Sequence, residues 1–457
     1  MTIKEFLDSV CKQIKYKPIR ENIAEELKNH IEESKENYIQ EGLEEQIAEE
    51  KAIEQMGDSE EIGKKLNKIH RPKLDWKLLI LILILVAYGI FIAICKQNSN
   101  NRIVKDTLIY MITGLIIGIV VYFIDYRKIK KYSNLLYLIA SLIIFLPAIG
   151  LCRSTINGID YFRIAGITFN TTIVAVPLFI ISFAGFMTSF NNKNKINVNI
   201  LDWNITIYKD LVKIIVFSIF SLLLIIMIPS MVNGMILGMI YLIIATIYVI
   251  KTSQRKMSIL VKIYAAMGIL VILVMFAIGI QPYHFERIAI SFHPELEPKG
   301  AGYMGMLQKE VIENAKLIGE ADTEIITTDK FIIPEESNFT FIFLLGKAGI
   351  LIASILVMVI ILTSIKLMIN SKFVKDIYGK MIIIGLGTLY ILQSIMSVLM
   401  NINLGIQLNV NLPFVSPGSV YFVVNAISIA FILSIYRRKD INLEIENGGK
   451  EYEQASK

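Results

Sequence analysis

The sequence is poor in charged residues and in the residues that bind metals. Asp, Glu, Lys and Arg make up only 19% of the 457 residues, beside four histidines and three cysteines. Cys11, Cys95 and Cys152 have no C-x-x-C spacing, so neither a thiolate metal site nor a redox pair is indicated. The chain also lacks the G-x-x-x-x-G-K-[ST], H-E-x-x-H and G-x-S-x-G motifs. We therefore expect no metal site and none of these common enzyme classes.

Apolar residues are abundant instead. Hydrophobic residues make up 54% of the chain, and the mean hydropathy of +0.57 excludes a purely soluble enzyme. The first apolar run begins near Leu78, too far from the N-terminus for a signal peptide. Runs long enough to cross a membrane lie at about 78–95, 107–124, 134–152, 172–189, 212–230, 233–250, 258–280, 341–365, 381–400 and 419–435. The pattern predicts a polytopic membrane protein with about ten transmembrane helices.

The charges are distributed unevenly along the chain. Residues 1–75 carry a net charge of −5, so the remainder carries +11. Lys and Arg gather in alternate short loops, which places those loops and both termini on the cytoplasmic side. Basic residues beside membrane spans report orientation, so we do not expect nucleic-acid binding.

Residues 1–72 read as a small soluble helical domain, because apolar residues recur there at helical spacing between acids and lysines. Gly42 and Gly57 are expected to end helices, and Asp58 or Ser59 to cap the next one. The fold class that we predict is all-α: a cytosolic helical domain, a ten-helix membrane domain over 73–440, and a cytosolic tail over 441–457.

One outer loop, 281–340, is too long to be a simple connection. Its residues 281–336 hold eleven acids and five bases. Because loops carry function more often than spans, we expect this loop to carry the active or binding site. Lys347 lies near the outer end of the eighth expected span, where it either reaches the lipid headgroups or serves function.

The last outer loop carries a family resemblance. It reads N-L-P-F-V-S-P-G-S over 411–419 and leads into the last expected span. This stretch resembles the P-F-[IV]-S-Y-G-G-S hallmark of the FtsW/RodA/SpoVE (SEDS) family. The matching residues are Pro413, Phe414, Ser416, Gly418 and Ser419. Pro417 stands in place of the tyrosine, and one glycine is missing.

Three further stretches agree in position, so the resemblance covers roughly residues 78–440. Asn157 and Gly158 are similar to the start of the family's N-G-x-R-R-W-I-x-x-G loop. Arg287 begins a stretch that resembles R-[IL]-x-x-[FW]-x-x-P. Residues 334–343 resemble P-E-x-H-T-D-F-I-F. Residues 1–72 are similar to another module, the helical HAAS-type domain of Gram-positive membrane proteins.

The resemblance implies a role in cell-wall biogenesis. Members of the family are peptidoglycan glycosyltransferases that polymerise lipid II at the outer membrane face, usually with a class B penicillin-binding protein as partner. It therefore implies lipid II or another undecaprenyl lipid as ligand and a multi-pass bacterial cell membrane protein. Division, cell shape and sporulation remain open as the cellular process. The sequence signals no cofactor and leaves the use of a divalent cation open.

The chain departs from the family where the chemistry takes place. The aspartate of H-T-D-F, the proposed catalytic carboxylate, aligns with Phe339, or with Asn338 or Thr340 after a one-residue shift. None of these side chains accepts a proton as a carboxylate does. Glu335 and Glu336 are nearby candidates to replace it.

Two hypotheses follow, and the sequence leaves open whether the chain is an enzyme. The first is an active polymerase with Glu335 or Glu336 as base and Arg287 or Arg163 near the pyrophosphate. The second is a catalytically degenerate scaffold, regulator or lipid-binding partner of a penicillin-binding protein. In both, the candidate substrate or lipid contacts are Arg287, Arg163, Asn157, Gly158, Asn338, Pro413, Phe414, Ser416 and Gly418.

Overall fold

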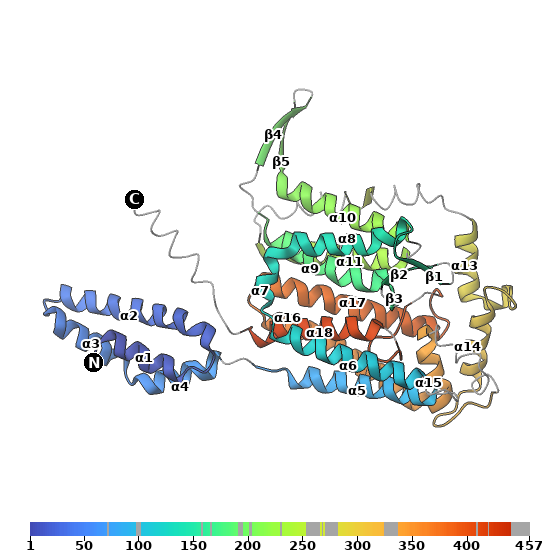
Figure 1. Cartoon of the computed structure of the whole chain (residues 1–457), viewed down its shortest axis with the longest axis horizontal. Helices are drawn as coiled ribbons and strands as arrows, with labels where there is room; N and C mark the ends of the chain where they lie inside the picture. The colour runs from blue at the N-terminus through green and yellow to red at the C-terminus, as the bar shows by residue number, and fades with distance from the viewer. Residues whose placement is uncertain are drawn as a thin grey trace. The chain divides into compact units, whose positions relative to one another are not determined.

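The computed structural model describes the chain from Met1 to Lys439 with internal gaps. The residues outside the description are 71–72, 97–101, 157–158, 165–166, 191–194, 201–202, 229–230, 253–265, 267, 270–281, 324–336, 408–409, 419 and 440–457. The chain divides into two compact units (Figure 1): Met1–Leu74, grouped with the residues from Tyr436 onward, and Asp75–Ile435. Each unit has a hydrophobic core of its own.

The first unit is helical, as the sequence predicts. Its elements are α1 (Ile3–Gln13), η1 (Lys17–Ile19), α2 (Arg20–Gln40), α3 (Glu45–Met56) and α4 (Ser59–His70). The core consists of Phe6, Val10, Ile14, Ile19, Ile23, Ile31, Ala52 and Ile53. Phe6 and Val10 lie four positions apart in α1, as do Ile23, Leu27 and Ile31 in α2, so these helices each turn one apolar stripe to the core and leave the opposite face to their acids and lysines.

The predicted helix ends in this unit are confirmed. Gly42 and Gly57 follow α2 and α3 with φ of +94° and +86°, a conformation that glycine adopts without steric cost. The Asp58 carboxylate accepts hydrogen bonds of 3.2 Å from the backbone N–H groups of Glu60 and Glu61. Asp58 is therefore the residue that caps α4.

The second unit is a bundle of long apolar helices (Figure 1). These are α5 (Trp76–Cys95), α6 (Arg102–Phe123), α7 (Tyr126–Ile129) with η2 (Lys130–Tyr132) and α8 (Ser133–Ala148), α9 (Thr171–Thr188), α10 (Lys209–Met227), α11 (Met231–Thr252), α16 (Ile350–Phe373), α17 (Ile377–Asn401) and α18 (Val420–Arg437). Among the described residues, eight segments are long and apolar enough to cross a membrane. The seventh expected span, 258–280, lies almost entirely outside the described residues.

The two helices at the centre of the bundle are α9 and α17. The buried share of the most apolar window is 78% in α9 and 67% in α17, but only 17% in α6. Figure 1 shows α17 between α9 and α16, and it packs against both. The apolar side chains of α6 therefore face lipid, whereas α17 can position residues inside the bundle.

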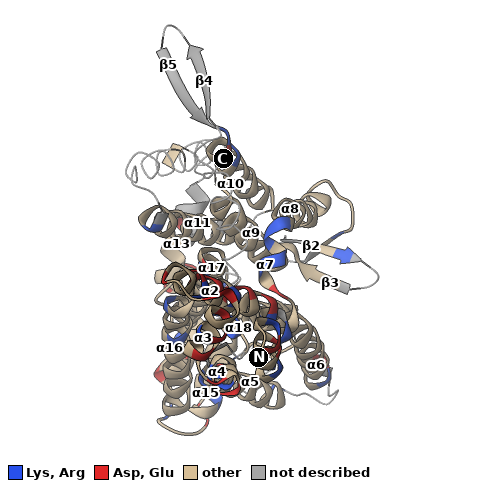
Figure 2. Cartoon of the chain, turned by 90° about the vertical axis from the view of Figure 1, so that its left-hand side faces the viewer, with Lys and Arg blue, Asp and Glu red and all other residues tan. Residues whose placement is uncertain are grey.

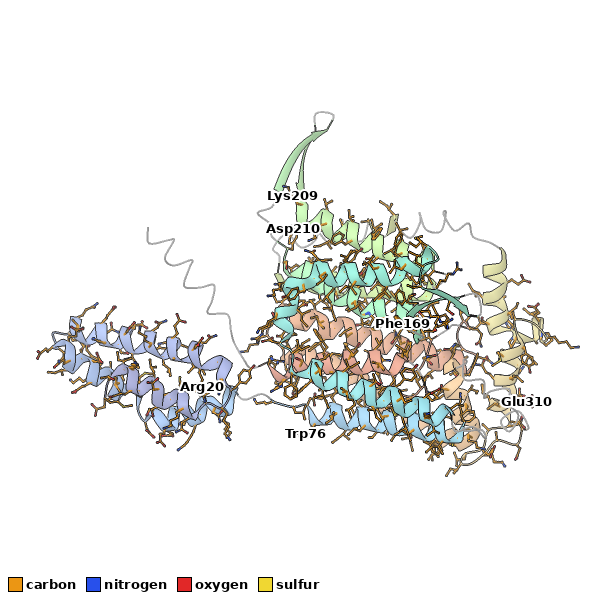
Figure 3. The ribbon with its side chains drawn as sticks, viewed as in Figure 1. Arg20, Trp76, Phe169, Lys209, Asp210 and Glu310 are labelled. Atoms are coloured by element: carbon orange, nitrogen blue, oxygen red, sulfur yellow. The ribbon has the colours of Figure 1, made fainter. Side chains whose placement is uncertain are left out.

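Two small sheets interrupt the helical pattern in segments for which the sequence predicts loops. β1 (Arg153–Ile156), β2 (Ile159–Ile164) and β3 (Ile167–Asn170) form an antiparallel sheet between α8 and α9. Phe162 pairs with Phe169 across it, with ring centroids 5.3 Å apart (Phe169 is labelled in Figure 3). β4 (Lys195–Ile200) and β5 (Trp203–Tyr208) form a hairpin. The sheets are minor, and the all-α polytopic class is confirmed.

The eighth expected span, 341–365, is wrong as a single helix. The chain forms a short helix, α15 (Thr340–Ala348), then breaks at Gly349 with φ of +93°, and α16 follows. A segment of the long loop, which we name the strap (316–321), fills the break. The Lys316 carbonyl accepts a 2.9 Å hydrogen bond from Ile350, and Ala321 donates one of 2.7 Å to Gly346. The strap thereby pairs backbone groups that the helix ends leave open.

The long loop 281–340 contains helices of its own. They are α13 (Pro282–Phe292), η3 (Pro294–Leu296), α14 (Tyr303–Glu313) and η5 (Ser337–Phe339). In Figure 1, α13 and α14 lie across one end of the bundle. We refer to this end as the outer end, after the orientation that the charges predict. The opposite, inner end carries the basic turn α7, blue in Figure 2.

Candidate functional site

Three segments that are distant in sequence meet at the outer end. They are the start of α15, the end of α17 and the loop 410–418. The hydroxyls of Thr340 and Ser416 lie 3.2 Å apart in a hydrogen bond. Asn401 accepts a 3.0 Å hydrogen bond from the Ile342 N–H and donates one of 2.9 Å to the Asn338 carbonyl. We name Asn338, Thr340, Asn401 and Ser416 the outer polar cluster.

The cluster is deeply buried for a set of polar groups. Thr340 and Asn401 have no exposed surface, and Ser416 is 5% exposed. Each of these side chains has to be hydrogen-bonded, because an unpaired polar group in an apolar interior raises the free energy of the folded state. The Ser416 hydroxyl also accepts a 3.0 Å hydrogen bond from the Leu412 N–H, which closes the loop on itself. The cluster thus fixes where α15 begins relative to the loop.

The loop 410–418 enters the bundle instead of lying over it. Residues 410–417 are all buried, and the Phe414 carbonyl packs against Gly89 of α5. Gly89 lies six residues before the outer end of α5 at Cys95, which corresponds to a depth of about 9 Å. Phe414 itself has φ of +64°, a conformation unusual for a bulky residue. The resemblance-bearing loop is therefore part of the core.

The structure brings together only some of the predicted site residues. Asn338 is half-buried in η5 and contributes its backbone carbonyl to the cluster. Pro413, Phe414 and Ser416 are buried in the loop, while Gly418 is exposed with φ of +65°.

The remaining candidates lie elsewhere or outside the description. Arg163 is exposed on β2. Arg287 belongs to α13, but its side chain lies outside the described part, as do Asn157, Gly158, Glu335 and Glu336 altogether.

The side chains of the outer polar cluster are neutral amides and hydroxyls. Such groups donate and accept hydrogen bonds at once, which suits the hydroxyls and amides of a sugar. They do not remove a proton at neutral pH, so the cluster alone holds no general base. Over the described residues, its groups bond to one another and to backbone, and so hold α15, α17 and the loop together.

One lysine lies in α15 and another lies beside it. Lys347 Nζ forms a 2.7 Å ion pair with Glu320 of the strap. Lys96, at the outer end of α5, lies 5.0 Å from the centroid of the Phe343 ring and is only 4% exposed. The sequence singled out Lys347 but not Lys96 or Glu320. No local pattern marks the latter two, since their partners are distant in sequence.

In the long loop, the described residues that could bind a metal include His293 and Glu295. No group of three or more His, Cys, Asp or Glu residues is suitably placed in the described part of the chain. His293 Nδ1 lies 3.3 Å from a carboxylate oxygen of Glu295, and both side chains are exposed. A backbone N–H and His293 lower the pKa of the Glu295 carboxyl.

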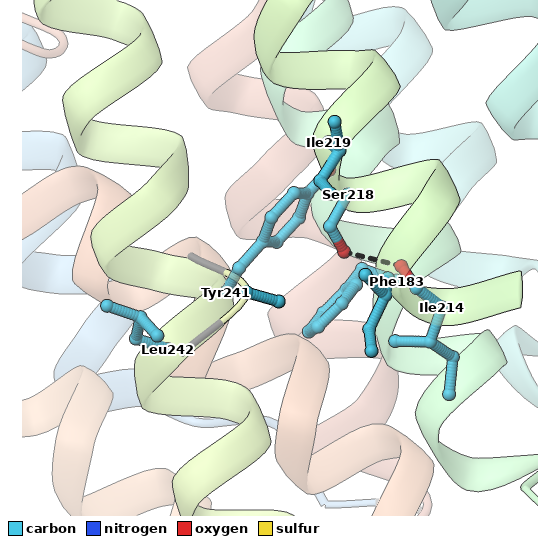
Figure 4. A pocket seen from close by; sticks show the side chains of 8 residues that line it. Phe183, Ile214, Ser218, Ile219, Tyr241 and Leu242 are labelled. Carbon is cyan, nitrogen blue, oxygen red and sulfur yellow. Dashed lines mark hydrogen bonds between the residues drawn. The ribbon is translucent and has the colours of Figure 1, made fainter. Parts of the chain in front are cut away.

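A small cavity between α9, α10 and α11 is not a ligand site (Figure 4). Its volume is about 10 Å³, which holds no more than one water molecule. The lining hydroxyls have partners already: Ser218 donates to the Ile214 carbonyl at 2.7 Å, and Tyr241 hydrogen-bonds Ser221 at 3.0 Å. Phe183 stacks on Tyr241, and both rings line the cavity.

Comparisons with known proteins cover the second unit. A family model described as FTSW_RODA_SPOVE, cell cycle protein, matches residues 73–441. A probable peptidoglycan glycosyltransferase FtsW of Enterococcus hirae is 26% identical over 164 residues, which span 35% of this chain and 41% of that protein. One of Nitrosomonas europaea is 23% identical over 393 residues, which span 81% of this chain and 94% of that protein.

A solved structure has a similar fold. A chain from a structure described as the coordination of polymerization and crosslinking by a peptidoglycan synthase complex matches with a TM-score of 0.63. Its sequence is 14% identical, and the match covers 81% of this chain and 99% of that chain. The family match begins at residue 73, so the similarity of residues 1–72 to a HAAS-type domain stays a prediction.

Proposed function

Because the chain belongs to the FtsW/RodA/SpoVE family of cell cycle proteins, we propose that it acts on lipid II, the lipid-linked precursor of peptidoglycan. It is a multi-pass bacterial membrane protein. The proposed reaction is polymerisation at the outer face. A sugar hydroxyl of one molecule attacks the pyrophosphate-linked sugar carbon of another, undecaprenyl pyrophosphate leaves, and the hydroxyl proton passes to a base.

The observation that carries this proposal is the outer polar cluster. Thr340 and Ser416 join the start of α15 to the buried loop that resembles the family hallmark. Its own groups are buried and paired with one another, so it supports the proposal by fixing that loop and the start of α15, beside which the lipid-linked sugar is held in this proposal. The names of the two curated relatives point to the same activity.

The base in this proposal is Glu335 or Glu336. Glu336 precedes Thr340 by four residues, and a chain spans at most about 3.5 Å per residue, so its Cα lies within about 14 Å of the Cα of Thr340. A carboxylate at that range can reach the cluster when the segment folds toward it. Arg287 and Arg163 are the proposed contacts of the pyrophosphate, as cations that form charge-assisted hydrogen bonds.

A second candidate function is non-catalytic. Asn338, Phe339 and Thr340 occupy the position where the family pattern has its aspartate, and none can act as a base at neutral pH. This departure favours a member that binds lipid II or another undecaprenyl lipid and serves as scaffold or regulator for a class B penicillin-binding protein. Such a partner is also expected for the active enzyme.

Polymerisation of fluorescent lipid II by the purified full-length chain distinguishes the two. The assay compares the wild type, Glu335→Ala and Glu336→Ala, each alone and with a class B penicillin-binding protein. Glu313→Ala is the matched control, because Glu313 is an exposed carboxylate of the same loop at the end of α14.

The relocated base is supported if the wild type forms glycan chains and either Glu335→Ala or Glu336→Ala lowers the rate by about 10²- to 10⁴-fold. Glu313→Ala should leave the rate unchanged. No chains under any pairing, with lipid II still bound, support the non-catalytic function. If the protein neither forms glycan chains nor binds lipid II, both candidate functions are overturned.

We further propose that both termini are cytoplasmic and that residues 1–72 form a HAAS-like regulatory or assembly domain, with 441–457 as a cytosolic tail. Cys152 is exposed beside β1, while Cys11 lies in α1, where burial raises the pKa of its thiol. A membrane-impermeant maleimide should label Cys152 in protoplasts with Cys95 replaced by serine, and Cys11 only after permeabilisation. The reverse pattern contradicts this orientation.

A further inference from the structure

Side-chain amides join α14 to the loop that follows α17. Gln407 Nε2 donates a 2.8 Å hydrogen bond to Gln308 Oε1 and a longer one, 3.4 Å, to Asn403 Oδ1. Asn403 in turn donates to the Gly305 carbonyl at 2.8 Å. We name Gln308, Asn403 and Gln407 the amide clasp. It begins two residues beyond Asn401, so it adjoins the outer polar cluster.

The clasp is only half paired. Two facing amides can exchange two hydrogen bonds, but Gln308 and Gln407 share one. Among the described residues, the buried atoms Gln308 Nε2 and Gln407 Oε1 have no hydrogen-bond partner, and Gln308 has no exposed surface. If the nitrogen and oxygen positions are exchanged in both side-chain amides, one donor and one acceptor are still unpaired. The conclusion therefore does not depend on which atom of each amide is taken as nitrogen.

An unpaired donor beside an unpaired acceptor matches one chemical group in particular. A secondary amide carries one N–H and one C=O, and both unpaired atoms of the clasp would be satisfied by it. The nitrogen and oxygen of an amide are about 2.3 Å apart, so the two unpaired atoms lie within about 7 Å of each other. An amide with a straight hydrogen bond of about 2.9 Å on each side spans about 8 Å. This exceeds the upper bound by about 1 Å, so the bridge requires bent hydrogen bonds or a small separation of the two glutamine side chains.

Buried polar atoms without partners are rare in folded proteins, and each such atom needs a physical reason. Gln308 and Gln407 carry no charge, so they give no advantage to a phosphate over a neutral ligand. We propose that Gln308 and Gln407 form a subsite that recognises a secondary amide of the lipid-linked saccharide, the ligand amide bridging Gln308 Nε2 and Gln407 Oε1. This inference rests on the proposed function and adds the feature of the ligand that is recognised.

Entry to the subsite requires movement, because both unpaired atoms are sealed from solvent. The elements linked to these two residues are α14, which carries Gln308, and α13, whose Ser291 hydroxyl accepts a 3.2 Å hydrogen bond from the Gln407 N–H. When the amide binds, α13 and α14 lift and then close on it. Amide hydrogen exchange of α14 should therefore slow in the presence of ligand.

Binding to the full-length wild type in detergent tests the ligand class without any mutation. Three probes are compared: lipid II, the same molecule with free amines in place of both sugar N-acetyl groups, and the N-acetylated lipid-linked disaccharide without its peptide. Weaker binding of the free-amine probe assigns the amide to the sugar. Weaker binding of the peptide-free probe assigns it to the peptide.

The variants Gln308→Met and Gln407→Met keep the side-chain length and remove the amide. Each should weaken binding of the preferred probe by about tenfold, the loss of about one hydrogen bond, and abolish the discrimination between probes. Asn314→Ala is the control, because Asn314 is an exposed residue at the end of α14 whose side-chain amide donates to the Glu310 carbonyl.

Three results overturn the subsite. The first is that the wild type binds all three probes with equal affinity. The second is that the Gln308→Met and Gln407→Met variants still discriminate between the probes as the wild type does. The third is that ligand does not change the hydrogen-exchange rate of α14. The first and third need no variant to fold. In each of them lipid II still binds, so the proposed function stands; binding of no probe at all overturns the function and the subsite together.

Discussion

Gly89 sets how deeply the loop 410–418 can enter the bundle. A Cβ atom at this position would lie 2.7 Å from the Phe414 carbonyl oxygen, closer than real contacts allow. Because that oxygen belongs to backbone, the loop must shift as a whole to make room. Glycine is needed here for close approach and not for a special φ.

We expect Gly89→Ala to lower the stability of the second unit by about 1–3 kcal/mol, the range typical of overpacking. Gly118→Ala is the matched control, because its added Cβ would meet Ala430 at an ordinary 3.6 Å. Thermal unfolding in detergent measures both. Equal melting temperatures for the two variants would show that the loop is free to move away.

Asn401 is the residue that holds the start of α15 in place. Asn401→Ala removes the partners of the Ile342 N–H and the Asn338 carbonyl, so we expect a loss of about 1–3 kcal/mol. Protease sensitivity next to η5 should rise as well. Asn425→Ala serves as control, since that buried asparagine donates only to the Tyr421 carbonyl of its own helix. A similar loss in both variants would mean that the link to η5 is not the cause.

At the scale of elements, the break at Gly349 decides the shape of the outer end. Gly349 has φ of +93°, and an added Cβ would lie 2.8 Å from Ile318 in the strap. Gly319 has a similar φ of +96° with open space around it. The pair therefore separates two costs, that of the backbone conformation and that of packing.

We predict that Gly319→Ala destabilises by about 1 kcal/mol, the cost of a positive φ, and that Gly349→Ala destabilises clearly more. The strap should also lose protection from hydrogen exchange in Gly349→Ala alone. Equal losses of stability in the two variants would show that the strap moves away from the added Cβ atom without loss of free energy.

A buried ion pair joins α5 to α16 near the inner end. Asp75 is 4% exposed and caps α5, and it also accepts hydrogen bonds from Lys366 at 2.9 Å and from Asn370 at 2.7 Å. Removing one partner from such a pair leaves an uncompensated charge, which costs more than removing both.

Lys366→Met should therefore lower stability by about 3–5 kcal/mol, and adding Asp75→Asn should restore part of it. Lys316→Met, which breaks an exposed ion pair with Asp322 in the same unit, should change stability by less than about 1 kcal/mol. A double-mutant cycle in thermal unfolding measures the coupling. Additive effects of the two substitutions would contradict it.

At the scale of the whole molecule, the two units have separate cores, so each should fold by itself. We expect a fragment of residues 1–72 to be helical by circular dichroism and to unfold cooperatively, because its core of eight buried apolar residues lies within it. Phe6→Ala should lower that fragment's stability by about 3–5 kcal/mol. A random-coil spectrum for the wild-type fragment would show that it depends on the rest of the chain.

The sequence predicted elements well where the signal was local. Leu78 to Cys95 reads as a continuous apolar run, and α5 spans Trp76–Cys95. It failed at Gly349, because one glycine inside an apolar run looks the same whether the helix continues or breaks. The break needs the strap, whose backbone partners lie about 30 residues away. The sheet β1–β3 was missed for a similar reason, because the sequence of one strand does not show which other strand it pairs with.

The site was predicted in part. The loop hallmark indicated Pro413, Phe414 and Ser416 as important, but nothing in the loop states that it is buried against Gly89. Asn401 was missed, because a lone asparagine at the end of a span has no distinctive spacing. Its role depends on Asn338 and Ile342, about 60 residues earlier in the chain.

Composition and periodicity by themselves determined that this chain lies in a membrane and that a helical domain precedes the bundle. They also predicted that the long loop 281–340 lies on one side of the membrane. These properties follow from the free energy of transferring each residue between water and lipid, which is local to the sequence. Only the tertiary structure decided which polar groups meet: Thr340 with Ser416, Asn401 with the start of α15, and Gln308 with Gln407. Hydrogen bonds are directional and short-ranged, so their partners are fixed by packing and not by position in the chain.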